Sequence, residues 1–438
     1  MSILTLMRDD LWQLAYSSIQ ALEDERGIVA SSRSEVYGAV FGRDSLITGL
    51  KLLEVYEKTQ DAYLLSIVRK ILDSLSALQG KELVIESGEE PGKIIHEFRP
   101  EGHEHLTSPS ATRTIEGAAW YLYPDEVMRN YDTVDATPLY LMLMHQYTIL
   151  SGDTAFIESH VAHITGALEW LMTYGDTNGD GFIDYRFHPD RSSGGLRVQS
   201  WMDSTESLFF EESDDVPQYP IAPVEVQAYA YVALRAASTI LEPFNASLSA
   251  IAHDRALQLQ ERFNETFVVG MRGEHVALAC GLSGDGRLLV SPRSSMGHVL
   301  WATFKEADAT PSRVLSPAYV EGVGRRLLAP DLFVPQAGVR TLSTQSKHYD
   351  PISYHNGSIW PHDTAILAEG LRRAGMLEEA KVVREALLTA YEHFMTPIEL
   401  FGFVGDGYVE YTTPQGGKAC RVQAWSAASL LSLLIDEP

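Results

Sequence analysis

Residues 41–53 read FGRDSLITGLKLL, and they join a pair of opposite charges to the start of an apolar helix. Arg43 and Asp44 stand side by side directly before a run of leucine and isoleucine. Two opposite charges at the start of a buried helix are costly unless they hold something polar. Guanidinium donors and carboxylate acceptors together suit two adjacent hydroxyls of a sugar ring. An acidic residue near a helix N-terminus, neutralised by its neighbour, is the structural alternative.

Helical periodicity extends from this segment over most of the chain. Strand-like alternation is sparse, and the best candidates are residues 267–279 and 402–411. The helical stretches come mostly in adjacent pairs with short connectors. About twelve are predicted, at 9–24, 44–59, 62–79, 135–151, 154–176, 223–241, 247–263, 295–305, 316–327, 356–374, 377–394 and 421–434.

Four long connectors separate these helices, at 80–134, 175–222, 328–355 and 395–420. They contain many of the tryptophan, tyrosine, histidine and charged residues. Loops of this length within a compact domain are usually functional. If the helix pairs stack into a ring, alternate loops converge on one face, and we expect the site there.

Composition narrows the class of protein further. No linker or low-complexity run interrupts the 438 residues, so we expect a single domain over 1–438. The net charge of -25 argues against nucleic acid and anionic membrane surfaces as partners. The two cysteines form no disulfide framework. The first twelve residues lack a signal-peptide pattern, and no stretch has the length of a membrane span, so we expect a cytoplasmic protein.

A second clue is Trp201 followed by Asp203 in the segment QSWMDS. An indole face stacks well on the apolar face of a pyranose ring. A carboxyl group in such a partly apolar environment can have a raised pKa and serve as a general acid. The pair therefore favours a sugar subsite over a tryptophan of the core beside an aspartate turn.

Hydrolysis of a glycoside needs a second carboxylate opposite the first. The connector 395–420 offers Glu399 and Glu410, each among aromatic and apolar neighbours. One of the two is expected to be an outward-facing residue on a strand or turn. The sequence around the two glutamates does not show which of them is the second carboxylate.

A third cluster, YHNGSIWPHD at 354–363, combines histidine, asparagine and tryptophan at a predicted helix start. Its histidines are not spaced like those of the common zinc motifs, and no cysteine joins them. We therefore predict no metal site there, but a wall that holds hydroxyls. Glu225 interrupts an apolar helix start, where it orients a sugar or caps its own helix. The substrate contacts predicted from the cluster at 354–363 are His355, Asn356, Trp360 and His362.

The segment DTNGDGFID at 176–184 is similar to the first nine positions of a calcium loop. Position twelve is Phe187 where such a loop carries a glutamate. Tight Asn-Gly and Asp-Gly turns explain the segment as well. Calcium binding is left open.

With these segments established, the chain resembles the amylo-α-1,6-glucosidase (glycogen-debranching) family of glycoside hydrolases. The similarity covers most of the chain, and its motifs follow the family's order. They are FGRDS at 41–45, GEEPGKIIHE at 88–97, WMDS at 201–204, PVEVQ at 223–227, MGHVLW at 296–301, GVRTLS at 338–343, the 355–363 cluster and QAW at 423–425.

The resemblance implies an all-α (α/α)6 barrel and inverting hydrolysis of an α-glucoside without a cofactor. Asp203 matches the general acid, and Glu399 matches the general base. Glu410 remains the rival, because more distant glucosidases of this fold place the base nearer the last helix. The resemblance also implies that Phe41, Arg43, Asp44 and Trp425 contact the sugar. The further N-terminal domains of debranching enzymes have no counterpart here, so a short α-glucoside or a glucosylated small metabolite is expected rather than glycogen.

Three other functions remain possible on this fold. A sugar epimerase or isomerase would use His355 and His362 for proton transfer. A glycoside phosphorylase would depend strictly on phosphate. A carbohydrate-binding protein with a degenerate site is the non-enzymatic alternative, although candidate acids on two separate loops argue against it.

Overall fold

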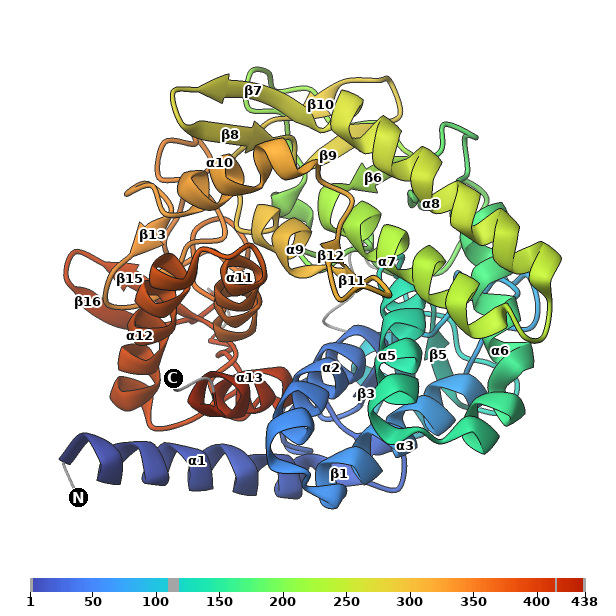
Figure 1. Ribbon diagram of the computed structural model, residues 1–438, viewed down its shortest axis with the longest axis horizontal. Helices are drawn as coiled ribbons and strands as arrows, with labels where there is room; N and C mark the ends of the chain where they lie inside the picture. The colour runs from blue at the N-terminus through green and yellow to red at the C-terminus, as the bar shows by residue number, and fades with distance from the viewer. Residues whose placement is uncertain (1–2, 109–117, 414–415, 436–438) are drawn as a thin grey trace.

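The computed structural model describes residues 3–108, 118–413 and 416–435. Within them, six helices form an inner ring around the centre of the molecule (Figure 1). Each contacts the next along the chain, and the last contacts the first, so that the ring is closed. These helices are α2 (Gly42–Thr59), α5 (Ala136–Ser151), α7 (Val224–Leu241), α9 (Met296–Trp301), α11 (Pro361–Arg373) and α13 (Ala424–Ile435).

Six outer helices cover this ring, and each packs against one inner helix next to it in sequence, with α1 packing on α13 across the chain ends. The protein is therefore an (α/α)6 barrel, and the predicted fold class is confirmed. The outer helices are α1 (Ile3–Leu22), α3 (Ala62–Ala77), α6 (Thr154–Thr173), α8 (Ala246–Thr266), α10 (Pro317–Leu327) and α12 (Leu377–Phe394).

Burial distinguishes the two rings. The inner helix α2 is buried continuously from Gly42 to Leu53, on every side of the helix. The outer helix α8 buries a single stripe at helical spacing, which includes Ala252, Ala256, Leu259 and Phe263. Each of the twelve predicted helical stretches overlaps one of these helices, with ends displaced by a few residues.

The strands are short and lie in the connecting loops. Three-stranded antiparallel sheets are formed by β3 (Val40–Phe41), β4 (Glu97–Arg99) and β5 (Met128–Asn130), and by β6 (Ile221–Pro223), β9 (Gly281–Ser283) and β10 (Leu288–Leu289). The predicted strand regions are the hairpins β7 (Val268–Arg272) with β8 (His275–Leu278), and β15 (Phe401–Val404) with β16 (Gly407–Glu410). The remaining pairs are β1 (Glu23–Asp24) with β2 (Gly27–Ile28), β11 (Phe304–Lys305) with β12 (Pro311–Ser312), and β13 (Phe333–Val334) with β14 (Gly338–Val339).

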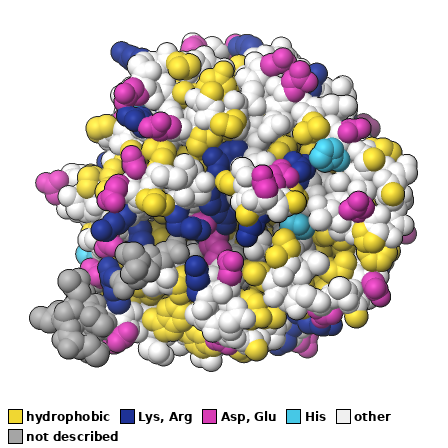
Figure 2. Space-filling view, viewed as in Figure 1, with side chains coloured by type: hydrophobic (Ala, Val, Ile, Leu, Met, Phe, Trp, Pro, Cys, Tyr) yellow, Lys and Arg dark blue, Asp and Glu magenta, His cyan; other side chains and the backbone are white. Residues whose placement is uncertain are grey.

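The two mouths of the barrel differ. At the C-terminal ends of the inner helices, a cavity of about 430 Å³ is lined partly by charged side chains, and Figure 2 shows such side chains in the middle of this face. Arg373 donates there to Glu54 of α2 at 2.9 Å and to Glu369 of α11 at 2.7 Å. The ion pair with Glu54 links the first and fifth helices of the ring, and the pair with Glu369 lies within α11. The N-terminal ends of the same helices carry the sequence-predicted site residues.

None of the helices in the described residues is long and apolar enough to cross a membrane.

Candidate active site

A cavity of about 200 Å³ lies at the N-terminal ends of the inner helices. Its walls come from β3 and α2, from the loop before α7, from the loop before α11 and from the loop before α13. Segments far apart in sequence therefore meet there. The sequence-predicted residues that line it are Phe41, Arg43, Asp44, Trp201, Asp203, His355, Trp360, Glu399 and Trp425.

Arg43 is the centre of a buried charge network. Its guanidinium donates to Asp135 at 2.8 Å and to Asp203 at 2.6 Å. Its own side chain is 4% exposed, that of Asp135 0% and that of Asp203 22%. Burial by itself would lower the pKa of Arg43, but the carboxylates around it outweigh that effect and raise the pKa further. Two of its nitrogens therefore bind the carboxylates of Asp135 and Asp203. The sequence had favoured contacts from this guanidinium to sugar hydroxyls.

Asp44 does not share the hydrogen-bond partners of Arg43. Its carboxylate accepts a long hydrogen bond from Gln423 at 3.4 Å. Burial, opposed by the charge of Arg43 and reinforced by those of Asp203 and Glu399, raises the pKa of Asp44 to about 8. Asp44 is therefore largely protonated at neutral pH, and it can donate a hydrogen bond as well as accept one.

Asp203 lies in the irregular loop between α6 and α7, just before the 3-10 turn Thr205–Ser207. Burial raises its pKa to about 6, and the ion pair with Arg43 works in the opposite direction. A carboxyl group with this pKa is protonated in roughly a tenth of the molecules at pH 7, far more often than an ordinary aspartate. It can supply a proton at the cavity wall.

Glu399 lines the cavity from another loop. Its Oε1 accepts from the Tyr354 hydroxyl at 2.5 Å, and its Oε2 accepts from the Cys420 backbone N–H at 2.6 Å. Burial raises the pKa of Glu399 to about 7, although both hydrogen bonds lower it. Its side chain is fixed by donors on both oxygens, as a positioned base requires.

Glu410 lies elsewhere. It is on the outer strand β16, where its carboxylate pairs with Arg421 at 2.8 Å and its side chain is 48% exposed. Of the two glutamates left open by the sequence, Glu399 is the one at the cavity, and Glu410 faces solvent. The structure therefore does not support Glu410 as the rival base.

Three further predicted contacts lie behind the cavity wall rather than on it. Asn356 is held by Arg293 at 2.9 Å and donates to the Glu206 carbonyl at 2.7 Å. His362 is fully buried and stacks on Trp425 at 3.7 Å between ring centroids, and burial holds its pKa well below the usual range. Glu225 lines a separate cavity of about 40 Å³, and burial raises its pKa to about 7. These side chains support the wall from behind. The sequence predicted that they contact the ligand directly, and the structure does not place them on the cavity surface.

Several polar atoms of the cavity-lining residues lack hydrogen-bond partners among the described residues. Buried polar groups are normally paired, and unpaired ones commonly mark a place for water or a ligand. Most of these atoms are N–H donors, and they belong to side chains whose other atoms line the cavity. They are Arg43 Nε, His96 Nδ1, Trp120 Nε1, Trp201 Nε1, Trp425 Nε1 and Gln423 Oε1.

In the part of the chain that the structure describes, no three acidic, histidine or cysteine side chains gather as a metal site would require. His355 instead pairs with the Ser204 hydroxyl at 2.7 Å. In the calcium-like segment, Asp176 accepts from the N–H groups of Gly179 and Gly181 at 2.8 and 2.9 Å, and from Arg255 at 2.9 Å. The turn itself occupies its carboxylate, which agrees with the turn interpretation of that segment.

Sequence reasoning missed part of the wall. Tyr354 belongs to the 354–363 cluster but received no role there, and Gln423 and the pair His96 and Glu97 stand out in the sequence only as members of motifs. Asp135 follows a long connector and marks no more than a helix start. No local pattern marks Tyr37, which comes from the loop before β3. The unforeseen lining residues include Tyr37, His96, Glu97, Arg99, His105, Trp120, Leu196, Tyr354 and Gln423.

A second, wider cavity of about 780 Å³ adjoins the first. Three residues line both cavities: Val36, Arg99 and His105. Arg99 is held there by an ion pair with Glu97 and by a hydrogen bond to the Val36 carbonyl at 2.6 Å. The two cavities thus share part of their wall, and this part carries the cationic side chain of Arg99.

A helical barrel with two acids and an aromatic wall in one cavity is the arrangement of a glycoside hydrolase. The family model described as the mannosylglycerate hydrolase MGH1-like glycoside hydrolase domain matches residues 130–426. This is more than half of the chain, and the protein belongs to that family. The expected glycoside hydrolase class is confirmed, whereas the matching family is not the amylo-α-1,6-glucosidase family. No protein with a curated description matches the sequence.

Solved structures share the fold over nearly the whole chain. The GH63 mannosylglycerate hydrolase from Thermus thermophilus in complex with glucose has a TM-score of 0.62 at 13% identity, over 97% of this chain and 99% of that one. The same hydrolase in complex with Tris has a TM-score of 0.61 at 13% identity and the same coverage. A glycosidase variant in complex with glucose has a TM-score of 0.56 at 15% identity, over 97% of this chain and 96% of that one.

Proposed function

We propose that this protein is an inverting glycosidase that cleaves an α-linked glycoside with a small aglycone. In this proposal Asp203 protonates the glycosidic oxygen, and Glu399 removes a proton from the attacking water. The observation that carries the proposal is that both carboxyl groups line one cavity of about 200 Å³, with pKa values raised to about 6 and 7. A general acid and a general base with pKa values near neutrality suit catalysis at physiological pH.

Each carboxyl group has partners that fix its position in the cavity wall. Arg43 holds Asp203 in place with an ion pair of 2.6 Å, and it also limits the rise of the Asp203 pKa. Tyr354 and the Cys420 N–H favour the ionised form of Glu399, which is the form that a base needs. An inverting enzyme must fit a water molecule between the sugar and the base, and its carboxyl groups lie roughly 6.5–9.5 Å apart for that reason.

The sugar would occupy the inner cavity. Trp201 and Trp360 meet edge to face there, at 5.5 Å between ring centroids, and they offer apolar surface to a pyranose ring. His96, Trp201 and Trp425 also line the cavity, and each carries a buried nitrogen without a hydrogen-bond partner among the described residues. Asp44, which is largely protonated, would complete this set as a donor or an acceptor.

The aglycone would lie at the junction of the two cavities, where Arg99 and His105 stand. A carboxylate on the aglycone suits the guanidinium of Arg99. The family's description names a mannosylglycerate hydrolase, and the similar Thermus thermophilus protein is also one, which favours glycerate as aglycone. The sequence resemblance favours glucose as the sugar. We therefore place α-glucosides and α-mannosides of small hydroxy acids, linked through the hydroxyl of the acid, first among the candidate substrates, and glycogen last.

The test is a screen of α-glucosides and α-mannosides with neutral and acidic aglycones, with the released sugar followed by proton NMR in the first minutes. The β-anomer is expected to form first and then to mutarotate. Release of the α-anomer as first product would exclude the inverting mechanism. Strict dependence on phosphate would indicate a phosphorylase instead. Asp203→Asn should lose most activity on alkyl glycosides while it retains activity on substrates with good leaving groups.

A further inference from the structure

The loop that carries Asp203 has almost no secondary structure of its own. Between residues 186 and 204 the backbone forms one isolated bridge, from Gly194 to Trp120, and no helix or strand. A general acid on such a segment is placed by side-chain and loop contacts alone. The question is therefore which groups hold the segment 186–204 in position.

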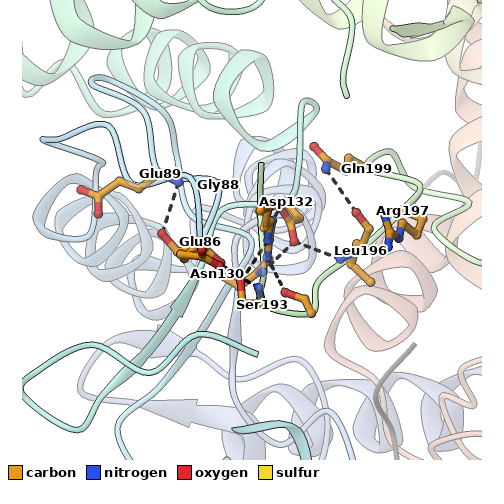
Figure 3. Close-up of polar contacts among 12 residues, drawn as sticks. Glu86, Gly88, Glu89, Asn130, Asp132, Ser193, Leu196, Arg197 and Gln199 are labelled. Carbon is orange, nitrogen blue, oxygen red and sulfur yellow. Dashed lines mark hydrogen bonds and ion pairs between the residues drawn. The ribbon is translucent and has the colours of Figure 1, made fainter. Parts of the chain in front are cut away.

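One buried carboxylate accounts for much of this anchoring. Asp132 accepts from Arg191 at 2.6 Å, from the Leu196 backbone N–H at 2.9 Å and from the Asn130 side chain at 2.9 Å (Figure 3). The side chains of Asp132 and Arg191 are 1% and 2% exposed. Arg191 in turn donates to the Gly194 carbonyl at 2.5 Å. One acid thus fixes two points of the loop directly, at Arg191 and Leu196, and a third, at Gly194, through the buried Arg191.

The loop passes so close to Asp132 that a side chain would not fit beside it. A Cβ atom on Gly195 would lie 2.2 Å from both Asp132 Oδ2 and Arg191 Nη2. On the other side, a Cβ atom on Gly88 would lie 2.7 Å from Asp132 Oδ1, and Gly88 has a positive φ of 71°. The two glycines allow the neighbouring loops to close around this carboxylate.

Glu86 holds the same loop from outside. Its carboxylate accepts from the Ser193 N–H at 2.7 Å and from the Ser192 hydroxyl at 2.9 Å, and its carbonyl accepts from the Ser193 hydroxyl at 2.5 Å (Figure 3). Against the raising effect of its partial burial, these hydrogen bonds lower the pKa of Glu86 to about 2. Glu86 is therefore ionised throughout the pH range in which the enzyme would work.

The segment that carries Asp132 also reaches the acid itself. The Val134 N–H donates to the Gln199 carbonyl at 2.9 Å, four residues before Asp203. Asp135 binds Arg43 at 2.8 Å, and Arg43 binds Asp203 at 2.6 Å. The five residues from Asn130 to Val134, together with Asp135, therefore fix both the start and the end of the loop.

We propose that Asp132, through its buried ion pair with Arg191, is a positioning residue that holds Asp203 at the distance from the glycosidic oxygen that proton transfer requires. Asp132 is not among the residues that line the cavity, and it acts through the loop. This inference rests on the proposed role of Asp203 as the general acid. A displacement of about 1 Å in a catalytic group can cost on the order of a hundredfold in rate.

The test separates misplacement of the acid from general damage. A methyl glycoside needs protonation of its leaving group, whereas the corresponding α-glycosyl fluoride needs little, because fluoride leaves readily. In Asp132→Asn we expect kcat/KM for the methyl glycoside to fall about a hundredfold and that for the fluoride to fall less than about fivefold. Asp203→Asn provides the limiting case, with the same selectivity and a larger effect.

Two further variants serve as controls. Asp125→Asn removes an exposed carboxylate that pairs with Arg129 at 2.5 Å, seven residues before Asp132, and it should leave both activities unchanged. Glu86→Gln weakens the outer anchor of the loop and should give the same selectivity at a smaller size, which keeps the test valid if Asp132→Asn does not fold. Far-UV circular dichroism and Tm establish that each variant is folded.

Equal loss on both substrates in Asp132→Asn and Glu86→Gln, or no loss in either, would overturn the positioning role. If Asp203→Asn itself shows no selectivity for the fluoride, the proposed general acid is wrong, and the failure belongs to the proposed function. Selectivity in Asp203→Asn without selectivity in the two loop variants would reject the inference about Asp132 alone.

Discussion

Arg43 binds Asp203 at 2.6 Å although 160 residues separate them in the sequence. The same guanidinium binds Asp135 at 2.8 Å, so one cation serves two carboxylates in a nearly water-free setting. Breaking a buried pair by removing one partner is costly because it leaves the other charge uncompensated. The contact therefore connects the stability of the barrel with the placement of the proposed acid.

Arg43→Gln should lower the free energy of unfolding by about 3–5 kcal/mol, because two buried carboxylates lose their partner. Urea unfolding followed by fluorescence measures this. Arg129→Gln, at an exposed ion pair with Asp125, should cost at most about 1 kcal/mol. Similar losses of unfolding free energy in the two variants would mean that water compensates for the charges of Asp135 and Asp203.

Asp44→Asn should stabilise the protein at alkaline pH. The folded-state pKa of Asp44 is raised from 3.8 to about 8, so the native state binds more protons than the unfolded state between these values. Stability due to this group is therefore greatest below pH 4 and is lost as pH rises through 8. An asparagine does not ionise, so the variant avoids this loss of stability. The gain is up to about 1.4 kcal/mol for each unit by which folding raises the pKa of Asp44. The Tm advantage of the variant over the wild type should be larger at pH 9 than at pH 5.

Wild-type kcat/KM should follow a narrow bell against pH, with limbs near the pKa values of about 6 and 7 of Asp203 and Glu399. The limbs belong to the pair of acids rather than to either one. Tyr354→Phe removes a hydrogen bond that lowers the pKa of Glu399, so the bell should shift to higher pH. Tyr408→Phe, whose hydroxyl contacts the Gln336 carbonyl on an outer hairpin, should leave the profile unchanged. A uniform loss without a shift in Tyr354→Phe would contradict this coupling.

Glu399→Gln and Glu410→Gln form a matched pair of variants on one loop. Removal of a general base typically costs a factor of about 10²–10⁴, and this loss is expected for Glu399→Gln only. Azide should restore part of the turnover and yield the β-glycosyl azide, which mass spectrometry and NMR detect. Near-normal turnover of Glu399→Gln, or a large loss in Glu410→Gln, would reverse the assignment.

Arg99→Gln should discriminate between substrates by the charge of the aglycone. For a glycoside of glycerate, we expect KM to rise about tenfold or more, which corresponds to about 1.4 kcal/mol of binding free energy. For a methyl glycoside, we expect little change in KM. Because Arg99 is also the partner of buried Glu97, the double variant Arg99→Gln with Glu97→Gln is the control that leaves no unpaired charge. Equal KM changes for both substrates in the double variant would exclude Arg99 from aglycone recognition.

The sequence by itself determined the helices, because apolar residues at helical spacing are a local signal. It also identified about half of the residues that line the cavity. Trp201 and Asp203 were identified because aromatic residues and acids concentrated in long connectors indicate a polar site, and Arg43 and Asp44 because they form a charged pair at the start of an apolar helix. The ordered motifs then indicated the barrel, which the six closed helix pairs confirm.

Tertiary structure alone showed that Glu399 lines the cavity and that Glu410 does not. Both follow α12 in one loop with similar neighbours, but Phe401 bridges to Ile359 in the interior, while Glu410 lies opposite Phe401 on the outer strand. It also decided that Arg43 serves Asp135 and Asp203, and that Glu225 and His362 lie behind the wall. Such outcomes depend on which distant segments become neighbours when the ring closes, and burial, which sets the pKa values of these acids, exists only after that closure.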